Sequence, residues 1–69
     1  MKNFQDLLAL STNDLRLEYE KATREVLSLK LHIAAGQEGD TAKLKKAKRY
    51  VARILTAMNQ QRMLASITA

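Results

Sequence analysis

Helix-breaking residues are confined to one place in this 69-residue chain. Proline is absent, and the two glycines, Gly36 and Gly39, both lie in the short stretch 36–40. The rest of the sequence is rich in Leu, Ala, Lys, Glu, Gln and Arg, which favour helices. The pattern therefore predicts an all-α chain with one turn near its middle.

Apolar residues on both sides of this turn recur at helical spacing, in steps of three and four residues, which places them on one side of a helix. Before the turn the stripe contains Leu15, Tyr19, Ala22, Val26, Leu29 and Ile33, widened by Leu27, Leu31 and Ala34. After the turn it contains Leu44, Ala47, Val51, Ile54 and Met58. Because a short turn favours antiparallel neighbours, we expect a long antiparallel two-helix hairpin with arms about 36 Å long.

Local signals predict where the first long helix begins and ends. Ser11 precedes Asp14 by three residues, as in a capping box, and Leu10 and Leu15 occupy the positions of a hydrophobic staple. Gly36 is suited to end the helix in a left-handed conformation. The first long helix should therefore span about 12–35.

The remaining elements follow from weaker signals. Asn3 is expected to cap a short helix over about 3–9 that folds across one end of the hairpin. Residues 36–40 form the turn, Asp40 or Thr41 caps the second long helix over about 41–64, and the end of the chain is frayed. Met58 and Met63 are expected to pack at the end of the hairpin. The whole chain, 1–69, is predicted to be a single domain.

Positive charge is concentrated after the turn. Asp40 is the last acidic residue, so segment 41–69 carries +7, whereas segment 1–40 has five basic and seven acidic residues and carries −2. On a helical projection most of the basic residues lie opposite the apolar stripe: Lys45, Lys46, Lys48, Arg49 and Arg53. An ordinary solvated helix face is the alternative, but such faces usually mix both signs. The unmixed charge therefore indicates a polyanionic partner, most commonly a nucleic acid.

Composition removes several classes of protein. Without cysteine and with a single histidine, the chain has no disulfide and no structural zinc site, and we expect no cofactor. It has neither an apolar run of about 20 residues nor the apolar core of a signal peptide, so we expect a soluble, cytoplasmic protein without membrane contact. A chain this small is also expected to be marginally stable alone.

No group of residues suggests catalysis. His32 is isolated, Ser11 is explained as a helix cap, and Glu18, Glu20 and Glu25 are expected on the outer surface of the first long helix. Aromatic residues are scarce, which argues against a surface that stacks single-stranded bases. Tyr50 lies within the basic run, where it either stacks on a base or sugar or covers the edge of the hairpin.

Three functions remain open at this point. The first is a nucleic-acid-binding structural protein. The second is a small dimeric regulator that binds DNA or protein, in which the apolar stripes pair between chains. The third is a small helical mutase acting on a dicarboxylate, which would need an enclosed pocket that a chain of this size forms only as an oligomer.

Several motifs together resemble one known family. The segments are 24–30 (Arg-Glu-Val-Leu-Ser-Leu-Lys), 34–37 (Ala-Ala-Gly-Gln) and 44–56, with Lys48-Arg49-x-Val51-Ala52-Arg53-x-x-Thr56. With the cap-acid-Leu start at 11–15, their order and spacing over about 4–62 resemble the ribosomal protein L twenty-nine family. That family often has Phe at the position of Leu27, Arg at that of Lys30, and a charged residue at that of Tyr50.

The resemblance implies a non-catalytic protein of the large ribosomal subunit, present there as a monomer. It implies contact with ribosomal RNA near the polypeptide exit tunnel, a neighbour of the L twenty-three family, and a surface where chaperones or targeting factors dock. Five basic residues are the main candidates for RNA contact: Lys45, Lys46, Lys48, Arg49 and Arg53. Lys30, Lys43 and Arg62 are supporting candidates.

Overall fold

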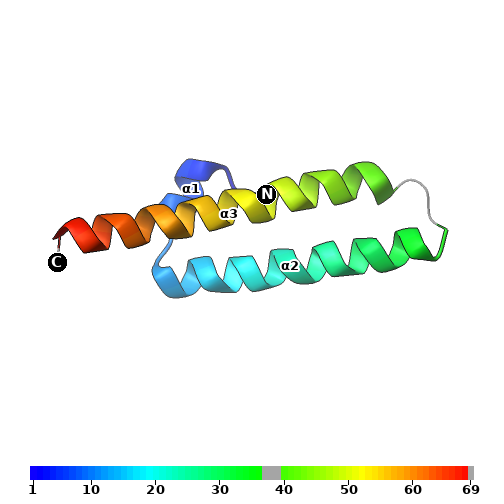
Figure 1. Cartoon of the computed structure of the whole chain (residues 1–69), viewed down its shortest axis with the longest axis horizontal. Coiled ribbons are helices and arrows are strands. Elements are labelled where there is room, and N and C mark those ends of the chain that lie inside the picture. Colours follow the sequence, from blue (N-terminus) through cyan, green and yellow to red (C-terminus); the bar gives the residue numbers. More distant parts are fainter. Residues whose placement is uncertain (37–39, 69) are drawn as a thin grey trace.

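The computed structural model describes residues 1–36 and 40–68, which form three helices (Figure 1). They are α1 (Phe4–Leu8), α2 (Thr12–Ala34) and α3 (Asp40–Thr68). The helices α2 and α3 lie side by side and run in opposite directions, and the molecule measures 50 × 16 × 14 Å. The predicted all-α hairpin with a short N-terminal helix is confirmed.

The local signals for the helix ends are present in the structure. The Asp6 N–H donates to the Asn3 side chain at 2.8 Å, and the Asp14 N–H donates to Ser11 Oγ at 3.1 Å. Each cap satisfies a backbone donor that has no partner within its helix. Gly36 follows α2 with φ +94°, and its N–H donates to the Ile33 carbonyl at 3.0 Å. The predictions for the turn at 36–40 and for the cap of α3 depend on residues 37–39, outside the described part of the chain.

The apolar stripe of α2 faces α3 as predicted. Leu15, Ala22 and Leu29, spaced seven residues apart, are buried. The intervening stripe residues are half-buried: Tyr19, Val26 and Ile33. This pairing within one chain uses the apolar surface that a dimeric regulator would need between chains.

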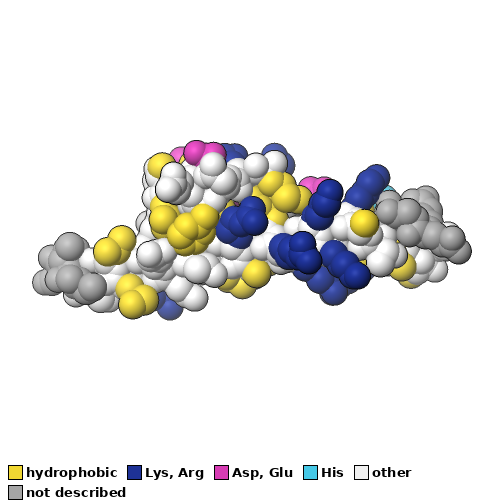
Figure 2. Space-filling view, turned by 90° about the horizontal axis from the view of Figure 1, so that it is seen from above, with side chains coloured by type: hydrophobic (Ala, Val, Ile, Leu, Met, Phe, Trp, Pro, Cys, Tyr) yellow, Lys and Arg dark blue, Asp and Glu magenta, His cyan; other side chains and the backbone are white. Residues whose placement is uncertain are grey.

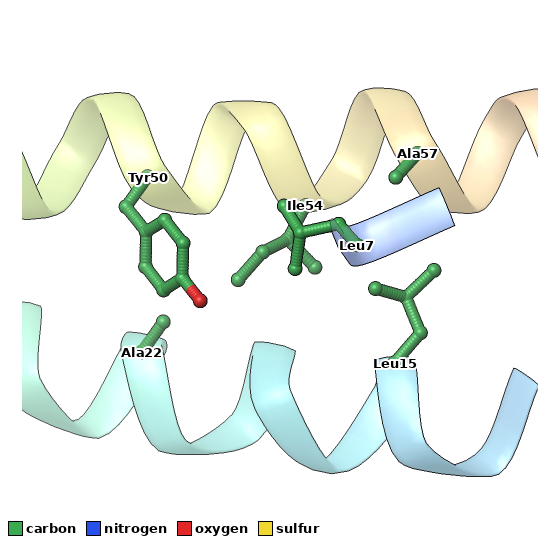
Figure 3. Packing of buried hydrophobic residues seen from close by; sticks show 6 residues of the cluster. All are labelled: Leu7, Leu15, Ala22, Tyr50, Ile54 and Ala57. Carbon is green, nitrogen blue, oxygen red and sulfur yellow. The ribbon is translucent and has the colours of Figure 1, made fainter. Parts of the chain in front are cut away.

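The buried side of α3 is rotated relative to the predicted stripe. Its buried residues are Ala47, Tyr50, Ile54 and Ala57, whereas the predicted stripe members Leu44, Val51 and Met58 are only half-buried. The cause is α1, which packs against α3 and places Leu7, fully buried, in the cluster with Tyr50, Ile54 and Ala57 (Figure 3). A short helix that contributes one large side chain thus decides which side of α3 becomes the core.

Polar contacts also attach the N-terminal segment to α3. Gln61 Nε2 donates to the Leu10 carbonyl at 2.8 Å and to the Leu8 carbonyl at 3.5 Å, and the Lys2 N–H donates to Tyr50 Oη at 3.3 Å. These bonds place α1 along α3 near the open end of the hairpin, where it was expected (Figure 1).

Three expectations about apolar surface and helix length were wrong. Leu27 and Leu31 are 59% and 62% exposed and do not widen the buried stripe, because they lie on a side of α2 that α3 does not cover. Met63 is 64% exposed, so of the two methionines only Met58 packs against the core. The helix α3 continues to Thr68, since neither proline nor glycine follows Leu64 to end it.

Within the described residues, no helix combines the length and the apolar character that crossing a membrane requires.

Candidate nucleic-acid interface

Five basic residues lie on three consecutive turns of α3, and we call them the basic face: Lys45, Lys46, Lys48, Arg49 and Arg53. All five are exposed, while Ala47 and Tyr50, which lie between them in the sequence, are buried against the rest of the hairpin. Figure 2 shows Lys and Arg side chains gathered over the half of α3 nearer to the turn. The 3.6-residue period of the helix thus separates a core side from a charged side, as the projection predicted.

Within the described part of the chain, no acidic side chain pairs with the basic face. Among the described residues, none of its five members forms a salt bridge, whereas Lys2 Nζ pairs with Glu18 Oε2 at 3.4 Å. Lys45, Arg49 and Arg53 follow one another at intervals of four residues, where like charges on a helix repel. An array of this kind is suited to bind an anion with several phosphate groups, since guanidinium groups can form paired hydrogen bonds with phosphate oxygens.

The three supporting candidates lie elsewhere. Lys43 is exposed in the first turn of α3, next to the basic face. Arg62 lies nine residues beyond Arg53, about 14 Å along the helix axis, and borders a groove of about 270 Å³ with Thr12 and Gln61. The structure therefore brings the five main candidates together and leaves Arg62 at a separate position.

Lys30 comes from the other arm of the hairpin. It lines an open groove of about 430 Å³ on α2, and sequence reasoning did not select a second cation, Arg24, that lines the same groove. Other lining residues are Glu20, Thr23 and Leu27, so the groove runs along one side of α2 at steps of three and four residues. The spacing of these residues was the signal present in the sequence. It identifies the groove only once it is known that this side of α2 stays uncovered.

Tyr50 is part of the core and does not extend the basic face. Its side chain is 6% exposed, and its hydroxyl donates to Glu18 Oε1 at 2.6 Å. Of the two predicted roles, covering the hairpin is therefore the correct one. The prediction that Glu18 lies on the outer surface was wrong, because this half-buried carboxylate faces Tyr50 and Lys2 across the hairpin.

The hydrogen bond between them shifts both pKa values. The bond from Tyr50 lowers the pKa of Glu18, against a smaller opposing effect of burial, and the charge of Lys2 adds to the lowering. Burial, followed by the bond to Glu18, raises the pKa of Tyr50. The pair is therefore held as carboxylate and neutral phenol near pH 7.

The other titratable residues do not assemble into a reactive centre in the described part of the chain. His32 lies exposed in the last turn of α2, and Glu20 and Glu25 are exposed on the same helix. No group of three potential metal ligands occurs among the described residues.

The sequence matches a known protein family over most of its length. Residues 5–61, which contain α1 from its second residue, all of α2 and the basic face, match the family described as Ribosomal L29 protein. The chain belongs to this family. Members of the L29 family are structural, non-enzymatic ribosomal proteins, and the match ends one residue before Arg62.

Two similar relatives of this L29 family chain come from different bacteria. "Large ribosomal subunit protein uL29" of Tropheryma whipplei (strain Twist) is 36% identical over 56 residues, which are 81% of this chain and 71% of the relative. The protein of the same name from Rubrobacter xylanophilus is 33% identical over 57 residues, which are 83% of this chain and 85% of the relative. No solved structure matches the chain.

Proposed function

We propose that this L29 family chain is a structural constituent of the large ribosomal subunit in the cytoplasm and binds ribosomal RNA through the basic face of α3. The observation that carries the proposal is the row of five exposed cations without an ion pair among the described residues. The names of the relatives support the subunit, because they are called large ribosomal subunit proteins. The charge supports RNA, since neutralising phosphates releases counterions and drives binding.

The proposed position is near the polypeptide exit tunnel, beside a protein of the L twenty-three family. The resemblance of the sequence supports this position. The uncovered side of α2 is compatible with a protein neighbour there, because Leu27 and Leu31 expose apolar surface beside Arg24 and Lys30. We also propose that chaperones or targeting factors dock near this protein at the tunnel exit.

Co-sedimentation tests the RNA-binding face. The double variant Arg49→Gln/Arg53→Gln should lose most of its binding to large subunits from which the native protein has been removed. The control Arg16→Gln/Lys21→Gln makes the same change in charge at exposed positions of α2 and should bind as the wild type does. Equal loss from both variants would show that net charge, and not this face, carries the binding. No co-sedimentation of the wild-type protein would contradict the proposed function itself.

A crosslinking experiment tests the neighbourhood. The chain contains no cysteine, so Leu31→Cys provides one attachment point for a thiol-directed crosslinker on the uncovered side of α2. In intact subunits this position should react with a protein lining the tunnel exit. A matched position on the basic face, Lys48→Cys, should instead crosslink to RNA. Crosslinks from Leu31→Cys to RNA alone would overturn the proposed protein neighbour.

A further inference from the structure

A second row of side chains runs along α2 on the side opposite the core, and we call it the outer stripe. Its members follow one another in steps of three and four residues and are all exposed: Leu17, Glu20, Arg24, Leu27 and Leu31. At about 100° per residue they lie within an arc of about 80° and face away from the buried residues of α2. Figure 1 shows α1 and α3 together on one side of α2. The outer stripe lies on the other side, where neither helix covers it.

Three members of the outer stripe are leucines that face solvent. Leu17, Leu27 and Leu31 are 57%, 59% and 62% exposed. Leu27 borders the open groove of about 430 Å³, which Glu20 and Arg24 also line. Exposed apolar side chains that gather on one helix face mark a contact surface, whereas single scattered ones do not. The groove leaves room beside Leu27 for an apolar side chain of another molecule.

The two charged members of the outer stripe are opposite in sign and are not paired with each other. Among the described residues, neither Glu20 nor Arg24 forms a salt bridge, although they lie four residues apart on one helix. A carboxylate and a guanidinium group in a row of leucines match a partner helix that carries the same two charges in reverse order. Such a partner also has to present leucines on both sides of the charges.

A second copy of the chain meets both requirements. Two α2 helices can lie antiparallel about a two-fold axis level with Ala22, which is midway between Glu20 and Arg24 and also midway between Leu17 and Leu27. In this register Leu17 faces Leu27 of the second copy, and Glu20 faces Arg24 of the second copy. The two-fold axis then repeats each pair, as in any contact between identical surfaces.

The charges also select this register over its neighbours. Sliding one helix by four residues brings Arg24 opposite Arg24 of the second copy, and sliding it four residues in the other direction brings Glu20 opposite Glu20. Like charges that face each other in a helical seam destabilise the pairing and so fix register and orientation. The sequence of the outer stripe is therefore complementary to itself in one antiparallel arrangement.

We propose that the free protein forms an antiparallel dimer through the outer stripe of α2. The pairing of α2 with α3 within each chain stays intact, because the outer stripe lies on the opposite side of the helix. The same side cannot hold a second copy and the proposed ribosomal neighbour at once. The dimer is therefore a form of the protein outside the ribosome, and it dissociates when the chain joins the subunit.

The size and charge of the contact set its strength. Residues 17–31 span about 21 Å of helix, which offers less than the roughly 800 Å² per partner of a standard interface. The net charge of +5 on each copy also opposes association. We therefore expect a dissociation constant on the order of 100 μM, with monomers at low concentration.

Charge reversal tests the dimer, with sedimentation velocity as the measurement. The wild type should shift from monomer to dimer between about 10 μM and 1 mM. Glu20→Arg and Arg24→Glu each place like charges opposite each other, so either variant alone should stay monomeric over this range. An equimolar mixture of the two should form a heterodimer, because one variant supplies two arginines and the other two glutamates. The double variant Glu20→Arg/Arg24→Glu should dimerise as the wild type does.

A matched control separates the pairing from net charge. Glu25→Arg changes the charge of α2 by the same amount as Glu20→Arg, at an exposed position outside the outer stripe, and should still dimerise. Circular dichroism shows whether each variant is folded. A heterodimer in the mixture has no explanation in the stability of the single helices, since each variant alone carries the same substitution.

Three results would overturn the proposal. A wild type that is monomeric at every concentration would leave the outer stripe to a different protein. A mixture that associates no better than the single variants would rule out the antiparallel register. Loss of the dimer in Glu25→Arg as complete as in Glu20→Arg would attribute association to net charge. None of these results affects RNA binding through the basic face, which the co-sedimentation experiment tests separately.

Discussion

The Tyr50 hydroxyl donates a 2.6 Å hydrogen bond to Glu18 Oε1 and so joins the two long helices through side chains 32 residues apart. The same hydroxyl accepts from the Lys2 backbone N–H, and Lys2 Nζ approaches the other Glu18 oxygen at 3.4 Å. Three segments of the chain therefore meet at one phenol. This contact also holds the Tyr50 ring away from the basic face that surrounds it in sequence.

Removal of the hydroxyl should destabilise the fold while leaving the ring in place. Tyr50→Phe is expected to lower the free energy of unfolding by about 1–2 kcal/mol, because the bond is to a charged, half-buried acceptor. Tyr19→Phe is the matched control, since no bond of the Tyr19 hydroxyl occurs among the described residues, and it should change stability by less than about 0.5 kcal/mol. Urea unfolding followed by circular dichroism measures both. Equal effects of the two variants would refute a structural role for the Tyr50–Glu18 bond.

The same bond predicts a loss of stability in acid. The folded-state pKa of Glu18 is lowered below its ordinary value of 4.5, chiefly by the Tyr50 hydrogen bond. Because the folded-state pKa of Glu18 is lowered, ionised Glu18 stabilises the fold fully above its unfolded-state pKa. This contribution to the free energy of unfolding disappears as pH falls through the folded-state pKa. The wild-type melting temperature should therefore fall below about pH 4.5, and Glu18→Gln should flatten this part of the curve. Glu25→Gln, at an exposed position of the same helix, is the control that should retain the wild-type slope.

Local features of the fold were predictable from sequence because their causes lie within a few residues. The Asn3 and Ser11 caps bond to N–H groups three residues further on, and the left-handed conformation at Gly36 follows from its missing side chain. The exposure of the basic face was predictable for the same reason, since helical spacing alone places Lys45 and Arg49 opposite Ile54.

Features that depend on contacts between distant segments were not predictable from these patterns. Docking of Leu7 against α3 turns Tyr50 and Ala57 into the core, and no periodicity within α3 contains that information. The uncovered side of α2, with Leu27 beside Arg24, likewise depends on how the two long helices face each other. The sequence pattern predicted which segments are helical and which side of each is apolar. The position of the five-residue helix α1 then decided which residues of α3 are buried.

The conformation of Gly36 predicts the cost of a side chain at the end of α2. Its φ of +94° is a left-handed conformation, and an added Cβ would meet nothing within 4 Å. Gly36→Ala should therefore lose about 1–2 kcal/mol of stability for conformational reasons alone, without a steric clash. Gly36→Asn should lose less, because asparagine tolerates this conformation better. Equal urea midpoints for the wild type and Gly36→Ala would contradict the left-handed cap.

Repulsion within the basic face predicts a variant that is more stable but binds RNA less well. Arg49 lies four residues from both Lys45 and Arg53 and three residues from Lys46, so Arg49→Gln removes three unfavourable charge pairs from the free protein. Its melting temperature at low salt should exceed that of the wild type, and the difference should shrink as salt screens exposed charges beyond about 10 Å at 0.1 M.

The control for this variant is Gln60→Glu, which also lowers the net charge by one and has no charged residue three or four positions away on α3. It should raise the melting temperature less than Arg49→Gln does, because it relieves no neighbouring pair. Equal gains from both would attribute the effect to net charge. A lower melting temperature of Arg49→Gln would instead show that the Arg49 side chain stabilises the free protein. Repulsion within the basic face would then not be what lowers the stability of the free protein.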